Sequence, residues 1–122
     1  AGKLKTFTDG DTLPLAAKAE NANGHTIGHS AFRFNNGQGA ALLVWGDLVH
    51  FPAIQFARPD ASYSFDYDAA AGIASRQRLM QEAAEQHLTV AGAHLPFPGI
   101  GRVNKDNDGR AYRWRPVEYT PQ

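Results

Sequence analysis

Apolar and polar positions along the chain predict short strands, one helix and then further strands. The alternation from Ser30 to Phe34 favours a strand with one solvent-facing side, and the continuous apolar run from Ala40 to Trp45 favours a strand buried on both faces. From Asp68 to His87 apolar residues return at helical spacing, and Asp68 is the expected N-cap. Leu88 to Ala91 predicts one more short buried strand. The pattern as a whole predicts an α/β (α+β) fold with one long helix.

Further strands are predicted near both ends of the chain. They are Leu4–Phe7, then Leu13–Ala19 as an edge strand containing Pro14, and a hairpin of Val103 and Ala111–Val117 across the turn Lys105–Gly109. The stretch from Phe51 to Pro59 has a proline near each end and is expected to be irregular. No internal repeat or low-complexity tract interrupts these elements.

Composition narrows the classes of function. The chain has 122 residues, 43% of them hydrophobic, which suits a globular protein. Twelve basic and 12 acidic residues balance to a net charge of zero, so we expect neither nucleic acid nor a membrane surface as a partner. With no cysteine, a metal site would depend on histidine and carboxylate ligands. The cell compartment stays open between bacterial cytoplasm and periplasm.

The sequence has five histidines, and their contexts differ. His25 and His94, like Asp47, follow a glycine or another small residue at the end of a strand or loop, where there is room for a metal ion. His87 lies at the expected C-terminus of the helix, where a structural role is favoured. His50 either lines a pocket or packs structurally, and the pattern leaves both open.

Three segments carry a resemblance to a known family. Gly24–Ser30 is similar to the GHTxGH segment of the metallo-β-lactamase superfamily, Leu42–Asp47 to its strand ending in Gly-Asp, and Ala91–His94 to its last ligand motif. Within the superfamily, Trp45–Phe51 and Ala93–Gly101 resemble the methyl parathion hydrolase-like branch. The similarity extends from about residue 10 to residue 118.

The resemblance implies a role for each site residue. His25 would bind the first metal ion, Asp47 would bridge both ions as the catalytic carboxylate, and His94 would bind the second ion. His29, His50 and Thr26 would support the ligands or line the pocket. Two divalent metal ions are implied, and zinc is the expected metal.

The superfamily's HxHxDH motif has no counterpart among the residues before His25. Residues 1–122 are therefore expected to be a single partial domain, the C-terminal half of an αββα sandwich, with a mixed sheet and one long helix. A complete relative would activate water on two metals to cleave small esters, lactones or organophosphates. The isolated chain, with too few ligands at each ion, is expected to be an inactive fragment.

Two other interpretations remain open. One is a non-catalytic domain that self-associates, or pairs with a missing N-terminal half, and keeps at most a structural or partial metal site. Setting the resemblance aside, it is a small α/β binding module with a histidine-rich pocket. Metal content together with turnover of an ester or lactone separates these alternatives.

Overall fold

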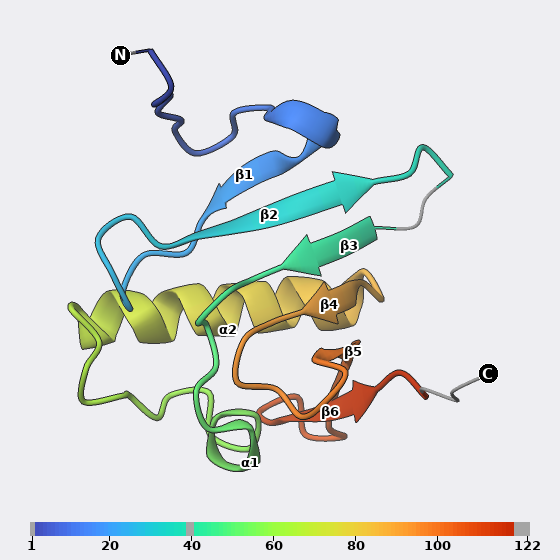
Figure 1. Ribbon diagram of the computed structural model, residues 1–122. Helices are drawn as coiled ribbons and strands as arrows, with labels where there is room; N and C mark the ends of the chain where they lie inside the picture. The colour runs from blue at the N-terminus through green and yellow to red at the C-terminus, as the bar shows by residue number, and fades with distance from the viewer. Residues whose placement is uncertain (1, 39–40, 119–122) are drawn as a thin grey trace.

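A mixed six-stranded sheet, with its strands in chain order, dominates the computed structural model (Figure 1). The structure describes residues 2–38 and 41–118. The strands are β1 (Lys18–Asn21), β2 (Ser30–Asn35), β3 (Ala41–Val44), β4 (Thr89–Ala91), β5 (Ile100–Lys105) and β6 (Tyr112–Pro116). β3 and β4 pair in parallel, and every other neighbouring pair is antiparallel. The predicted mixed sheet is confirmed.

The two N-terminal strand predictions fare differently. Leu4–Phe7 was expected to be a strand, but these residues do not form one, and Leu4 is 88% exposed. The predicted strand Leu13–Ala19 is wrong in its first half, where Pro14–Ala16 forms a short 3-10 helix, η1. Proline fixes the backbone torsion φ and lacks an amide N–H, so the sheet begins only at Lys18.

The long predicted helix is confirmed as α2 (Ala69–Glu85). Asp68 caps it, because its side chain accepts a hydrogen bond of 3.0 Å from the backbone N–H of Ala71. The segment expected to be irregular contains a single short helix, α1 (Pro52–Gln55). Figure 1 shows α2 lying along the sheet, with its first turns beside the β1–β2 connection. Among the described residues, no helix is long and apolar enough to cross a membrane.

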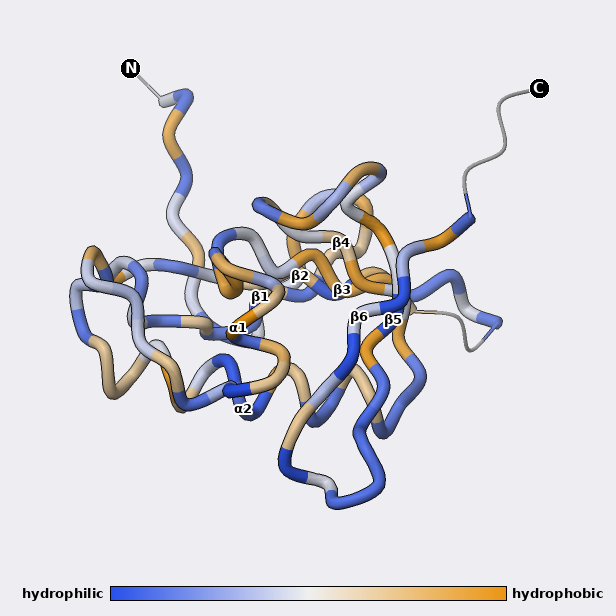
Figure 2. Tube along the Cα trace, turned by 90° about the horizontal axis from the view of Figure 1, so that it is seen from below, coloured by the Kyte–Doolittle hydropathy of each residue, from blue (hydrophilic) through white to orange (hydrophobic). Residues whose placement is uncertain are grey.

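The core lies between α2 and one face of the sheet. Leu79 and Met80 of the helix pack in the same cluster as Leu43 of β3 and Val90 of β4, and all four side chains are fully buried. Figure 2 shows apolar stretches of chain gathered where β3 and β4 run side by side. Burying each such side chain stabilises the fold by roughly 1.5–3 kcal/mol. The parallel pair at the centre of the sheet is thereby fixed against α2.

The opposite face of the sheet is apolar and only partly covered. Phe32 lies opposite Val44 and Phe34 opposite Leu42 in the β2–β3 register, so these four side chains share one face. They alternate with the fully buried Leu43, which belongs to the core beneath α2. All four are partly exposed. We call Phe32, Phe34, Leu42 and Val44 the open sheet face.

Candidate metal centre

The site lies where several connections meet at one end of the sheet. Because β3 and β4 are parallel neighbours, the segments that follow them emerge side by side. Backbone hydrogen bonds continue this pairing beyond the strands: Trp45 N–H donates to Ala91 O, and Ala93 N–H donates to Gly46 O, each at 3.0 Å. The next residues in the two segments are Asp47 and His94, which are brought together in this way.

Asp47 and His94 contact each other directly. His94 Nε2 lies 2.8 Å from Asp47 Oδ1, and the two side chains are 47% and 40% exposed. His94 has a positive φ of 60°, which is uncommon for a residue other than glycine and costs backbone energy. An imidazole and a carboxylate are therefore held together at a solvent-accessible position.

His29 lies beneath Asp47 and uses both ring nitrogens on backbone groups. Its Nδ1–H donates to Ala22 O at 2.9 Å, and its Nε2 accepts from the N–H of Asp47 at 3.0 Å. These partners fix a neutral tautomer protonated on Nδ1. The ring also requires glycine at position 46, because a Cβ atom there would lie 2.8 Å from His29 Nε2. His29 thus contacts the backbone of the site and has no nitrogen free for a metal ion.

His25 is oriented by a buried carboxylate that the sequence did not reveal. Its Nδ1 lies 3.1 Å from Asp66 Oδ1, and the Asp66 side chain is 2% exposed. The carboxylate accepts a hydrogen bond from Nδ1–H, so Nε2 keeps its lone pair for a cation. Asp66 Oδ2 also accepts from the N–H of Tyr63 at 3.3 Å and lies 3.9 Å from Arg76 Nη2.

His50 occupies the centre of the cluster. Its ring centroid lies 4.5 Å from that of His25, 4.9 Å from that of His94 and 4.2 Å from the stacked ring of Tyr63. Burial lowers the pKa of His50 below its ordinary value, and the neighbouring His25 and His94 lower it further, while Asp66 and Asp47 act in the opposite direction. The lower pKa favours the neutral ring, which is the form of histidine that binds metals.

Thr26 stands apart from the other predicted site residues. Its side chain is exposed, and its carbonyl oxygen accepts hydrogen bonds from Gly24 N–H at 3.1 Å and His29 N–H at 3.3 Å. Thr26 therefore shapes the turn that carries His25, and these contacts use its backbone.

The donor set fits a divalent metal. Two groups of three side chains could each hold a metal ion, because the potential ligand atoms within each group lie within 4.8 Å of one another. One group is His25, His50 and Asp66, and the other is Asp47, His50 and His94. Imidazole nitrogen and carboxylate oxygen are ligands that zinc and related ions accept. His50 Nδ1 is buried and has no hydrogen-bond partner among the described residues, as expected for a polar atom in a binding site.

No protein-family model and no curated protein matches the sequence. Solved structures do match. The hydrolase AbOPH of the β-lactamase superfamily is 30% identical with a TM-score of 0.87, and the match covers 94% of this chain and 38% of that one. The dizinc quorum-quenching lactonase AidC, solved with a product, N-hexanoyl-L-homoserine, is 29% identical with a TM-score of 0.87 over 98% of this chain and 40% of its own.

A third structure, a probable metal-dependent hydrolase from Staphylococcus aureus, shares the fold at 19% identity and a TM-score of 0.65. The match covers 89% of this chain and 38% of that structure's chain. The chain thus spans about two fifths of the length of each of these neighbours. Over that span its mixed sheet and long helix have the fold of the metallo-β-lactamase superfamily hydrolases.

Proposed function

We propose that the chain is the C-terminal half of a binuclear metal-dependent hydrolase of the methyl parathion hydrolase-like branch. The observation that carries this proposal is the convergence of His25, Asp47 and His94 from three separate connections on one site. Each of these residues stands in a motif that resembles a ligand motif of the superfamily. The remaining ligands would come from residues outside these 122.

In the proposed enzyme, His25 would hold one metal ion, His94 the other, and Asp47 both. Two zinc ions would supply Lewis acidity and activate water near neutral pH. His29 and Asp66 position these ligands, because the His29 ring accepts a hydrogen bond from the backbone N–H of Asp47, and the Asp66 carboxylate accepts one from the His25 ring. Ligand orientation by such partners changes metal affinity by roughly 10- to 100-fold.

The substrate class is proposed to be small esters and lactones, with organophosphates as further substrates. The neighbour AidC is a lactonase, which supports a cyclic or acyclic ester as the reacting group. An open site beside aromatic side chains suits such molecules, since the exposed Phe51 and the partly buried Tyr63 lie with ring centroids 5.5 Å apart next to His50.

The test compares two proteins loaded with zinc: the 122-residue chain and the same chain with any coding sequence that precedes Ala1 in its gene. Metal content and hydrolysis of phenyl acetate, a homoserine lactone and a phosphotriester are measured. We expect turnover in the longer protein, its loss in Asp47→Asn and its retention in His87→Asn. Equal activity in the two variants, or a longer protein without metal or turnover, would overturn the proposal.

A second candidate function rests on the open sheet face. Phe32, Phe34, Leu42 and Val44 form a partly exposed apolar surface on the side of the sheet away from α2. Contiguous apolar surface of this kind mediates association. The alternative is therefore a non-catalytic domain that self-associates through this face.

A further inference from the structure

His50 is held in place before any ligand arrives. The buried side-chain oxygen of Gln55 accepts two hydrogen bonds, one from the backbone N–H of His50 at 2.7 Å and one from that of Phe51 at 3.0 Å. Gln55 Nε2 in turn donates to Ala61 O at 3.2 Å, which links α1 to the next loop. Tyr63 stacks on the ring at an interplanar angle of 23°. Both the backbone and the ring of His50 are thus fixed by residues that are themselves packed.

The position of His50 changes the number of ligands available within this chain. Asp47 and His94 alone, or His25 and Asp66 alone, would give a metal ion two protein ligands, but His50 completes a group of three with each pair. Three protein ligands with one open position are the usual set of a catalytic zinc. His50 is thus the residue that the two groups share.

The two groups differ in how free their other members are. Asp66 is 2% exposed and already engages His25, the Tyr63 amide and Arg76. Asp47 and His94 are 40% and 47% exposed, and their nearest atoms are joined by a single hydrogen bond of 2.8 Å. A cation entering between these atoms replaces one shared proton and needs only the movement of exposed side chains. The group of Asp47, His50 and His94 is therefore favoured.

We propose that the 122-residue chain alone binds one divalent transition-metal ion, such as zinc, through Asp47, His50 and His94. His50 would serve as a ligand, in addition to its place as a pocket residue, and the site is open to solvent at Asp47 and His94, whose side chains are 40% and 47% exposed. This site needs no residue from outside the chain. It does not rest on the proposed hydrolase activity.

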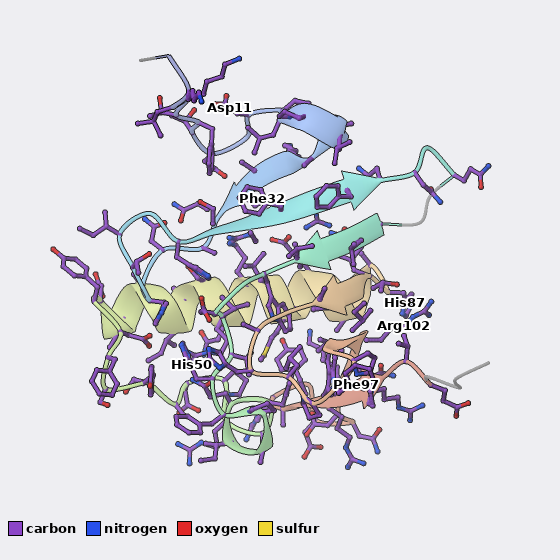
Figure 3. All side chains as sticks on the ribbon, in the orientation of Figure 1. Asp11, Phe32, His50, His87, Phe97 and Arg102 are labelled. Carbon is purple, nitrogen blue, oxygen red and sulfur yellow. The ribbon has the colours of Figure 1, made fainter. Side chains whose placement is uncertain are left out.

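The test is titration of the metal-free chain with Zn²⁺ by calorimetry and with Co²⁺ by visible absorption. We expect one ion per chain and the absorption of a four-coordinate Co²⁺ site. His50→Ala and His94→Asn should each weaken binding at least tenfold, whereas His87→Asn should change it less than twofold. His87 is a suitable control, because it lies at the far end of α2 from His50 (Figure 3), and asparagine tolerates its positive φ of 53°.

His25→Gln separates the two groups and should change the affinity less than threefold. Circular dichroism of each metal-free variant checks its fold, and His94→Asn keeps the test valid if His50→Ala does not fold. A chain that binds no zinc, or a His25→Gln variant that loses binding while His94→Asn keeps it, would overturn the assignment. Failure of the hydrolase proposal shows itself separately, as a lack of turnover in the longer protein.

Discussion

The guanidinium of Arg76 and the carboxylate of Asp66 lie 3.9 Å apart inside the protein, and each side chain is only 2% exposed. Arg76 Nε also donates to Leu48 O at 3.0 Å, and its Nη1 donates to Pro59 O at 3.2 Å. Asp66 in turn orients His25. One buried arginine therefore connects α2 with the loop before it and with the segment that carries Asp47.

Arg76→Met should be strongly destabilising. Burial lowers the pKa of Arg76 and the nearby Asp66 opposes that shift, so the carboxylate is the main charge that balances the guanidinium. Methionine would remove this partner from the buried Asp66 and from three carbonyl oxygens, those of Leu48, Pro59 and Ala61, at a cost of about 3–5 kcal/mol. The free energy of unfolding in urea measures the loss.

Arg58→Met is the matched control for that experiment. Arg58 also pairs with a carboxylate, Asp60 at 3.1 Å, but the two side chains are 70% and 54% exposed. An exposed pair contributes little, so this variant should unfold as the parent does. Equal losses in Arg58→Met and Arg76→Met would contradict the role given to burial.

Gly24→Ala should destabilise the protein more than its backbone torsion alone explains. Gly24 has φ +133°, and a Cβ atom there would lie 2.1 Å from the backbone nitrogen of Gly72 in α2. Gly37 also has a positive φ, of 75°, but no atom of the described residues lies within 4 Å of its added Cβ. We expect a loss of about 1 kcal/mol for Gly37→Ala and at least about 3 kcal/mol for Gly24→Ala. Thermal or urea unfolding of both variants provides the comparison.

His29→Ala should loosen the backbone at Asp47. Without the ring, the N–H of Asp47 and the carbonyl of Ala22 lose their partners, which costs about 1–3 kcal/mol when such groups stay buried. Hydrogen exchange of the Asp47 amide, followed by NMR, should become faster. Ser30→Ala removes only an exposed hydrogen bond to Gly28 O and should leave that exchange rate unchanged. An Asp47 amide that stays protected in His29→Ala would contradict this assignment.

Leu42→Glu should reduce self-association of the chain. Leu42 lies on the open sheet face, where a carboxylate cannot be buried against a second apolar surface without a large penalty. Light scattering over a concentration series measures the mass of parent and variant. Gln77→Glu adds the same charge on the exposed side of α2 and should behave like the parent. A parent that is monomeric at all concentrations would remove the basis for association through this face.

The sequence predicted most of the fold because the central elements have strong periodicity. The apolar run that became β3 and the capped helix α2 needed only local signals, a buried strand pattern and Asp68 as N-cap. The strand expected at Leu4–Phe7 does not form, because an alternating pattern does not ensure a neighbouring strand to pair with. In the next predicted strand, Leu13–Ala19, Pro14 begins a short 3-10 helix instead.

The candidate site was predicted only in part. His25, Asp47 and His94 stand in motifs, and the structure brings them to one end of the sheet. Asp66 has no such signal, since it is one carboxylate in a loop of mixed residues. Arg76 falls within the apolar stripe of α2, where its burial depends on carbonyl groups from distant loops. Partners of this kind are set by tertiary structure, which no local pattern encodes.

The contacts of the site also bear on how the protein folds. His25 and Asp66 are 41 positions apart in the chain, and Asp47 and His94 are 47 positions apart. Contacts over such separations form late, because each closes a long loop before it gains its partner. The site therefore comes into being only once β3, α2 and β4 have docked, and a metal ion that binds there stabilises the assembled native state selectively. Metal affinity thus becomes a reporter of global folding, and any destabilised variant will need more metal to reach the same native population.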